Sequence, residues 1–320
     1  MTASSANDSQ INRTTIVVAL GLAVAFVVAV LGGARYFVTK AAHQPVAMSQ
    51  LDSPLADSSE CSALIDALPS SLNGHRRAEL AAPAPAGAAA WQSSSTERIT
   101  LRCGVHLPAQ YTEYSDPLTF DAAGARWLRV DDATPGSTLS TWFSIDREPA
   151  VAVTADEASL GTAATPLDDL DLSALPQKTQ PPASAPLSQL AAASGGDAAS
   201  TQACRALVDA TPDSIAEGYR RLDETSADAA HTVAWIAEGK EPIVVRCGVA
   251  APESYAAGAQ LSQVNDVPWF EDTTLANGTT TSTWYALGRV TDVAASLPQS
   301  VGNEAVTNLS TLIADTLPER

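Results

Sequence analysis

The chain has 320 residues, a formal net charge of −18 and only 5% aromatic residues. This length accommodates two domains of about 115 residues together with an anchor and linkers. The first 40 residues hold three basic groups and one acidic group, so the remainder carries 15 basic and 35 acidic groups, a net charge of −20. Such a surface repels nucleic acid and anionic lipid headgroups, so we expect no nucleic-acid partner.

An uncharged, largely apolar stretch, residues 14–34, follows a short polar N-terminus. As a helix it spans about 30 Å, the thickness of one bilayer core. We interpret residues 1–13 as a cytoplasmic tail, 14–34 as a transmembrane anchor and 35–58 as a spacer. The alternative is a cleaved signal peptide, whose apolar region is normally shorter and preceded by more positive charge.

The tetrapeptide Arg-Cys-Gly-Val occurs twice, at residues 102–105 and 246–249, and its surroundings recur with it. The recurring tryptophans, cysteines and arginines are Trp91 and Trp235, Cys103 and Cys247 (each 144 residues apart), Cys61 and Cys204 (143 apart), and Trp127 and Trp269, Trp142 and Trp284, Arg147 and Arg289 (each 142 apart). This period is too long for a solenoid unit, so each copy is expected to be a domain with its own core. We place repeat 1 at residues 59–177 and repeat 2 at 202–320, joined by a flexible linker at 178–201 that is rich in Pro, Ala, Ser and Gly.

Each repeat is predicted to have an α+β fold, with an antiparallel sheet between an opening helix and a closing helix. In the opening helix of repeat 1, Cys61, Leu64, Ile65 and Leu68 form one apolar stripe that ends at Pro69. The closing helix of repeat 2 is predicted from a second stripe, formed by Val306, Leu309, Leu312, Ile313 and Leu317. In repeat 1 the closing helix is predicted from a weaker apolar pattern, formed by Leu167, Leu170 and Leu175.

The strand that ends in Arg-Cys-Gly-Val alternates apolar and polar residues. Ile99, Leu101 and Cys103 share one face, and Arg102 points the other way. Cys103 therefore faces the core, where the helix that carries Cys61 would pack. We predict one structural disulfide in each repeat, Cys61 with Cys103 and Cys204 with Cys247, in an oxidising compartment. A redox role is the alternative, because a neighbouring arginine lowers a thiol pKa.

The compartment bears on topology. Arg13 precedes the apolar stretch, whereas Arg35 and Lys40 follow it, which leans slightly against export of the C-terminal body. The paired cysteines outweigh this count. We therefore expect a single-pass membrane protein with its C-terminal body outside the cytoplasm.

Several charged residues recur although basic residues are scarce: Asp66 and Asp209, Arg102 and Arg246, Arg147 and Arg289. The plain interpretation is structural, either as Asp–Arg pairs or as arginines that brace a loop. The alternative is a site for a carboxylate or phosphate. The six recurrent tryptophans (Trp91, Trp127, Trp142, Trp235, Trp269 and Trp284) are expected in the core, with a sugar-stacking platform as the alternative. The histidines lack metal spacing, so neither metal nor cofactor is expected.

This arrangement resembles an actinobacterial family of anchored or secreted proteins known as domain of unknown function 3515. The resemblance rests on a helix that opens with Cys and closes at Leu-Pro, a Trp before the Arg-Cys-Gly-Val strand, and a Trp on the next strand. Both repeats carry it, whereas family members usually carry one copy. Gln92 and Ile236 stand where the family commonly has Gly. The resemblance implies a cell-envelope location and brings no known activity.

Two functional hypotheses follow. The first is a non-enzymatic envelope protein whose two modules bind a protein partner or a wall component, with avidity from the duplication. The second is an envelope enzyme, or a small-anion or sugar-binding protein, that uses the recurrent Asp and Arg groups. A further variant is that repeat 1 has become a spacer, since its closing helix is the weaker one.

Overall fold

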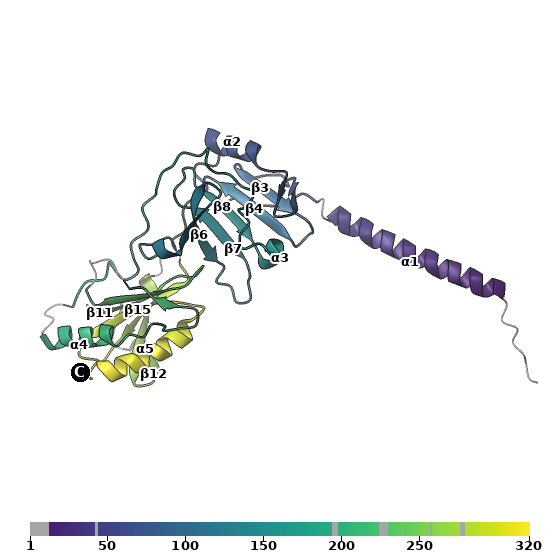
Figure 1. Cartoon of the computed structure of the whole chain (residues 1–320). Coiled ribbons are helices and arrows are strands. Elements are labelled where there is room, and N and C mark those ends of the chain that lie inside the picture. Colours follow the sequence, from purple (N-terminus) through teal and green to yellow (C-terminus); the bar gives the residue numbers. More distant parts are fainter. Residues whose placement is uncertain (1–12, 42–43, 194–197, 224–229, 257, 276–278) are drawn as a thin grey trace, which may run out of the picture.

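The computed structural model describes residues 13–41, 44–193, 198–223, 230–256, 258–275 and 279–320. An N-terminal helix, α1 (Arg13–Ala41), extends away from two sheet-containing parts (Figure 1). Within α1, Ile16–Phe37 is long and apolar enough to cross a membrane, and none of it is buried. The predicted cytoplasmic tail lies outside the described residues except for Arg13.

The first part is built on an antiparallel sheet in the strand order β1-β2-β3-β4-β8-β7-β6-β5. Its strands are β1 (Ser71–Leu72), β2 (His75–Ala78), β3 (Ala88–Gln92), β4 (Arg98–Cys103), β5 (Thr119–Ala122), β6 (Ala125–Asp131), β7 (Ser140–Ser144) and β8 (Val151–Ala155). Two helices, α2 (Ser59–Ala67) and the short α3 (Glu157–Leu160), and a 3-10 turn, η1 (Asp116–Leu118), accompany it. The Ser58 hydroxyl caps α2 by accepting from the Cys61 amide, and the helix ends just before Pro69.

The second part repeats this topology without the first strand, in the order β12-β13-β14-β15-β11-β10-β9. Its strands are β9 (Arg220–Arg221), β10 (Thr232–Ile236), β11 (Ile243–Val249), β12 (Ser262–Val264), β13 (Val267–Asp272), β14 (Thr281–Ala286) and β15 (Asp292–Pro298). Its helical segments are α4 (Ala198–Asp209), α5 (Gly302–Thr316) and the 3-10 turn η2 (Thr273–Leu275). The matching strand order supports the interpretation of the chain as a tandem of two copies.

The two repeats close differently. In repeat 2, α5 lies against α4 and strands β12, β13 and β15, and Leu309 and Ile313 are fully buried. The prediction of a closing helix in repeat 1 is wrong, because residues 163–177 form turns. Pro166 and Pro176 bracket this short segment, and the Asp171 carboxylate accepts from the Ser173 amide at 2.9 Å, which favours a turn over a helix. Leu167, Leu170, Leu172 and Leu175 still fill the core from these turns.

Residues 44–58, the first strap, pack on repeat 1 and are not the loose spacer expected between anchor and domain. Val46 is 2% exposed, and its N–H donates to the Glu79 carbonyl at 2.8 Å. The Leu55 N–H donates to the Gly104 carbonyl at 3.3 Å. Through these contacts the first strap runs along the sheet before α2 begins.

The segment expected to be a flexible linker, residues 178–201, packs in the structure over residues 183–193, and its last four residues belong to α4. Residues 194–197 of this segment lie outside the described residues. Residues 183–193, the second strap, run along the sheet of repeat 2 as the first strap runs along the sheet of repeat 1. The Ala193 N–H donates to the Gly248 carbonyl at 2.9 Å, which is the counterpart of the Leu55 bond to Gly104. Ala185 and Leu187 are buried against the sheet. Backbone hydrogen bonds hold both straps, which explains why their small and polar residues carry no periodic signal.

The two repeats contact each other directly. Residues 110–118 of repeat 1 lie on the face of the second sheet that α4 and α5 leave uncovered, and the buried Tyr114 joins an apolar cluster there with Ile236 and Phe270. The Asp131 N–H donates to the Gly239 carbonyl at 2.8 Å. The buried Glu241 carboxylate accepts from the Gln110 side-chain amide at 3.0 Å and from the Thr280 hydroxyl at 2.6 Å.

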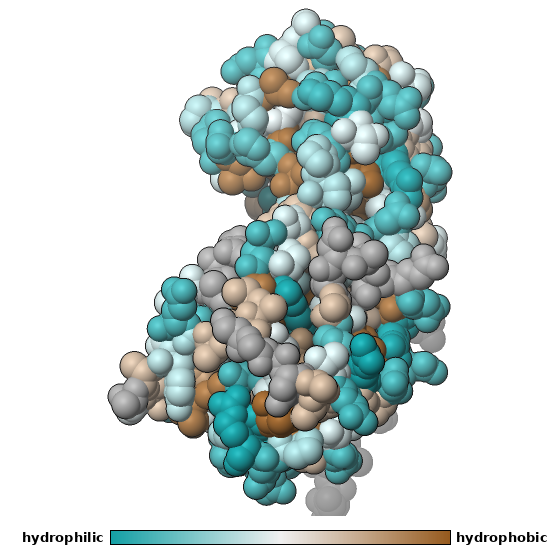
Figure 2. All heavy atoms as spheres, turned by 90° about the vertical axis from the view of Figure 1, so that its left-hand side faces the viewer, coloured by the Kyte–Doolittle hydropathy of each residue, from teal (hydrophilic) through white to brown (hydrophobic). Residues whose placement is uncertain are grey.

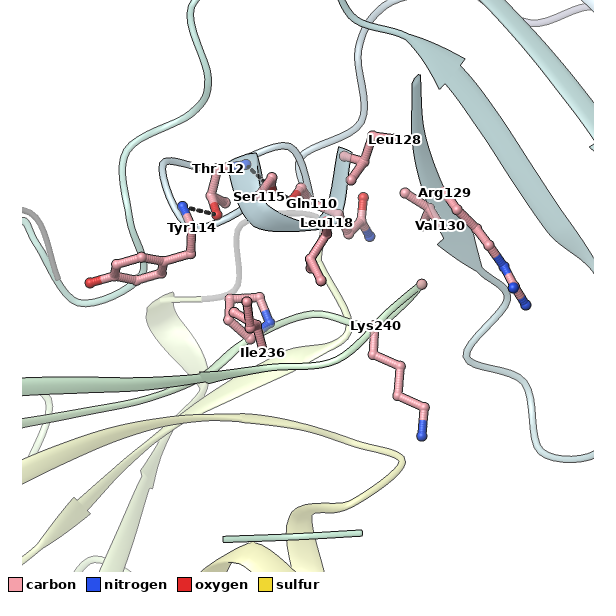
Figure 3. A pocket seen from close by; sticks show the side chains of 12 residues that line it. Gln110, Thr112, Tyr114, Ser115, Leu118, Leu128, Arg129, Val130, Ile236 and Lys240 are labelled. Atoms are coloured by element: carbon pink, nitrogen blue, oxygen red, sulfur yellow. Dashed lines mark hydrogen bonds between the residues drawn. The ribbon is translucent and has the colours of Figure 1, made fainter. Parts of the chain in front are cut away.

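The contact is close at its centre. Figure 3 shows Leu118 of repeat 1 directed at Ile236 of repeat 2, beside a cavity of about 10 Å³. This is about the volume that one water molecule needs. Apolar packing and buried hydrogen bonds therefore join the two repeats into one unit.

The glycine after each core cysteine is required by backbone conformation. Gly104 and Gly248 have φ of +82° and +83°. We expect Gly104→Ala to lower the free energy of unfolding by about 1–2 kcal/mol from this conformation, with about 1–3 kcal/mol more from overlap. The overlap arises because a β-carbon on Gly104 would lie 2.3 Å from the Ala56 nitrogen of the first strap.

Gly248→Ala is the matched control, because its nearest described neighbour, the Cys204 sulfur, is 3.5 Å away. Thermal unfolding followed by circular dichroism should show the larger loss for Gly104→Ala. Equal losses for the two variants would contradict the close fit of the first strap.

A second glycine tests the contact between the repeats. Gly239 has φ of +71°, and a β-carbon there would lie 2.2 Å from an oxygen of the Asp131 carboxylate, which the Arg129 guanidinium and the Ser140 hydroxyl hold in place. We expect Gly239→Val to separate the repeats, so that calorimetry resolves two unfolding transitions where the wild type shows one. Gly161→Val has the same backbone strain, at φ +59°, with nothing within 4 Å. That control should lower stability without splitting the transition, and an unsplit Gly239→Val transition would count against the rigid unit.

Candidate functional site

The four cysteines form the two predicted disulfides, Cys61–Cys103 and Cys204–Cys247, with Cα–Cα distances of 5.6 and 5.5 Å. Each bond joins the opening helix of a repeat to its central strand. All four residues are at most 3% exposed. The bonds close loops of 42 and 43 residues, for which loop-closure entropy gives a stabilisation of about 4 kcal/mol each. Their burial supports the structural role over the redox alternative.

The arginine of each Arg-Cys-Gly-Val holds the strap of its own repeat. Arg102 donates to the Ser49 carbonyl at 2.8 Å. Arg246 donates to the carbonyls of Leu187 and Leu190, both at 2.8 Å, and of Ser188 at 3.2 Å. Partial burial also lowers the pKa of Arg102. Both guanidinium groups therefore serve as braces, one of the roles expected from the sequence.

The other recurrent arginines brace a turn in the same way. Arg147 donates to the Gly124 carbonyl at 3.0 Å through Nε, and Arg289 donates to the equivalent Asp266 carbonyl at 2.7 Å. Each also pairs with the last residues of its repeat through an isolated bridge, Arg147 with Gln177 and Arg289 with Glu319. Arg289 is 4% exposed. These arginines tie the end of each repeat to the hairpin between two strands.

The recurrent aspartates lie elsewhere. Asp66 and Asp209 are exposed on α2 and α4. In the described part of the chain neither forms an ion pair with Arg102, Arg246 or any other residue. The structure therefore does not assemble the recurrent acids and arginines into one anion site.

The recurrent tryptophans are core residues. Trp91, Trp127, Trp142, Trp235 and Trp269 are at most 1% exposed, and Trp284 is half-buried against the same core. Two of the indole N–H groups donate to backbone carbonyls: Trp91 to the Pro69 carbonyl and Trp235 to the Pro212 carbonyl, both at 2.9 Å. A sugar-stacking platform requires exposed ring faces, so the five buried rings do not provide one.

A cleft of about 560 Å³ lies between the two repeats. Repeat 1 supplies Phe120 of β5, Trp142 of β7 and the turn at Ala164 and Thr165; repeat 2 supplies Tyr219 and Arg220. Figure 2 shows a hollow between the two repeats with hydrophobic surface on its upper, repeat 1 side. Its volume falls in the range of about 300–1,000 Å³ that is typical of ligand pockets.

The polar groups of the cleft differ in how far they are already paired. The Tyr219 hydroxyl donates to the Glu241 carbonyl at 3.0 Å, and burial raises its pKa, so it stays protonated. Glu238 lies 3.5 Å from Arg129. Arg220 is exposed and forms no ion pair within the described residues. The cleft therefore offers aromatic and aliphatic surface with one available cation at its rim.

A second cavity, about 700 Å³, lies beside the disulfide of repeat 2. Its carboxylate is Asp292, which is 8% exposed and has a pKa raised by burial, an effect opposed by Arg320 at 3.5 Å. Repeat 1 has Ala150 at this position. The cavity thus holds one acid balanced by an arginine. Within the described residues no group of three His, Cys, Asp or Glu could hold a metal ion.

Sequence reasoning did not single out the residues of the cleft. Phe120 and Tyr219 do not recur between the repeats, so recurrence gave no signal for them. Arg220 does recur, as Arg76, so its recurrence alone does not mark it as a residue of the cleft. A difference between the repeats at one position was the usable signal. Phe120 stands where repeat 2 has Ser262, and each pairs with the recurrent tryptophan of the neighbouring strand. A large apolar residue on one edge strand and a small polar one on its counterpart indicates that the two edges have different surroundings.

The fold and the recurrent residues define a tandem of two disulfide-linked α+β domains behind an N-terminal apolar helix. Residues 20–182 and residues 173–320 each match a family described as protein of unknown function (DUF3515). The chain belongs to this family and carries its domain twice. No curated protein and no solved structure matches the chain. Both matched ranges begin ahead of the opening helix and include the strap, which supports the straps as parts of the domain.

Proposed function

We propose that this protein is a non-enzymatic, membrane-anchored component of the cell envelope that binds a partner in the cleft between its repeats. The observation that carries the proposal is that the cleft needs both repeats, whereas the recurrent cysteines and the arginines Arg102, Arg147, Arg246 and Arg289 are used within each repeat to hold its fold. A retained α1 presents the two repeats outside the membrane. The two disulfides fit an oxidising compartment on that side.

The competing proposal of an enzyme or a small-anion site has less support. It depends on Asp66 and Asp209 acting together with the recurrent arginines. Those aspartates are exposed and unpaired in the described chain, and Arg102 and Arg246 are hydrogen-bonded to backbone carbonyls. A guanidinium group that already donates to carbonyls has fewer donors left for a substrate oxyanion.

The site is tested by photo-crosslinking in the cells that make the protein. A photoreactive amino acid replaces Arg220 at the cleft or, as a matched control, the exposed Arg205 on α4. We expect a discrete crosslinked species from position 220 and none from position 205, because only the first faces the cleft. The absence of any adduct at 220, or the same adduct from both positions, would contradict the cleft as the binding site.

A further inference from the structure

The cleft occupies the place in repeat 1 that a helix fills in repeat 2. In repeat 2, α5 lies against the edge strand β12. The counterpart of β12 is β5, because Phe120 of β5 and Ser262 of β12 each pair with the recurrent tryptophan of the next strand, Trp127 and Trp269. Strand β5 lines the cleft through Thr119 and Phe120 and has no closing helix on it.

The residues that correspond to α5 form a wall of this cleft. Ala164 and Thr165 are the counterparts of Val306 and Thr307, 142 residues later, in the first half of α5. In repeat 1 they lie in turns beside the cleft. The later leucines, Leu167 to Leu175, still fill the core. The first half of the helix is therefore the part that repeat 1 lacks, and the opening over β5 remains.

We propose that the cleft binds an amphipathic helix of a partner protein, which takes the position that α5 takes in repeat 2. This inference rests on the proposed function of the cleft and adds the chemical class of its occupant. The helix would place apolar side chains at i, i+3 and i+7 against the half-buried Phe120 and the neighbouring Leu118, as helix-in-groove partners do. An acidic residue on its flank would pair with the available Arg220.

Repeat 2 forms the side of the cleft that faces β5. Tyr219, Arg220 and Ile236 to Glu238 close the cleft opposite β5. In repeat 2, the strand that corresponds to β5 is β12, and α5 covers it. Val301 and Val306 pack there against the core of repeat 2. The two repeats have the same strand order, so repeat 2 shows which shape fits this surface.

The chain supplies its own probe. A synthetic peptide of Gly302–Thr316 carries the Val306, Leu309 and Ile313 stripe. Because an isolated helix of this length is marginal in water, a covalent staple between the exposed positions 307 and 311 holds it helical. We expect saturable binding to the full-length protein in detergent, measured by fluorescence anisotropy. The same stapled peptide with serine at the three stripe positions should not bind.

Two variants of the protein locate the peptide. Ala164→Arg fills the cleft from an exposed position, and Phe120→Asp removes its aromatic wall. Each should weaken binding about tenfold or more, which corresponds to about 1.4 kcal/mol. Ala67→Arg, on the exposed surface of α2, is the matched control and should leave binding unchanged. Circular dichroism checks that all three variants fold.

The outcomes separate this inference from the function on which it rests. Binding that Ala164→Arg does not weaken would mean that the peptide exchanges into repeat 2, and it would overturn the inference. In a second arm, soluble cell-wall fragments replace the peptide. Fragments that bind in an Ala164→Arg-sensitive way, with no peptide binding, would overturn the helix while the cleft stands as a binding site. Failure of both probes, together with no crosslink at position 220, would overturn both proposals.

Discussion

Each repeat depends on the disulfide that ties its opening helix to its central strand. The constraint continues through the neighbouring residues of Arg-Cys-Gly-Val. The glycine turns the chain at positive φ beside the disulfide, and its carbonyl accepts the strap amide. The arginine, on the opposite strand face from the cysteine, holds the same strap by its carbonyls. Three consecutive residues, Arg-Cys-Gly, thus join helix, strand and strap, which accounts for their recurrence as a unit.

The parts that could be predicted from the sequence are those with a periodic or covalent signal. The Cys61 stripe predicted α2, and the alternation around Leu101 predicted β4 and the inward direction of Cys103. The prediction of a closing helix in repeat 1 was wrong because leucines at this spacing fill a core equally well from successive turns. Prolines and aspartates then favour turns. The straps were not predicted because backbone hydrogen bonds hold them, and the cleft was not predicted because it forms only where the two repeats meet.

The duplication has produced two copies with different surroundings. In repeat 2, α5 covers one face of the sheet, and the second strap, together with residues 110–118, covers the other. Repeat 1 lacks the first half of that helix and meets repeat 2 at the gap. The recurrent cysteines and braced arginines maintain a shared scaffold, while residues found in one copy only, such as Phe120 and Tyr219, shape the surface between the copies. The recurrent arginines therefore brace the fold by donating to backbone carbonyls and do not form a catalytic set.

Hydrogen exchange of the full-length protein in detergent tests the central claim, that the recurrent arginines maintain the scaffold. Arg102→Ala should raise amide exchange in residues 44–58 about tenfold or more and leave residues 183–193 unchanged, and Arg246→Ala should do the reverse, because a strap that loses its brace opens locally. Strap protection that is unchanged in both variants would contradict the account. It would free these arginines for the anion site that the structure argues against.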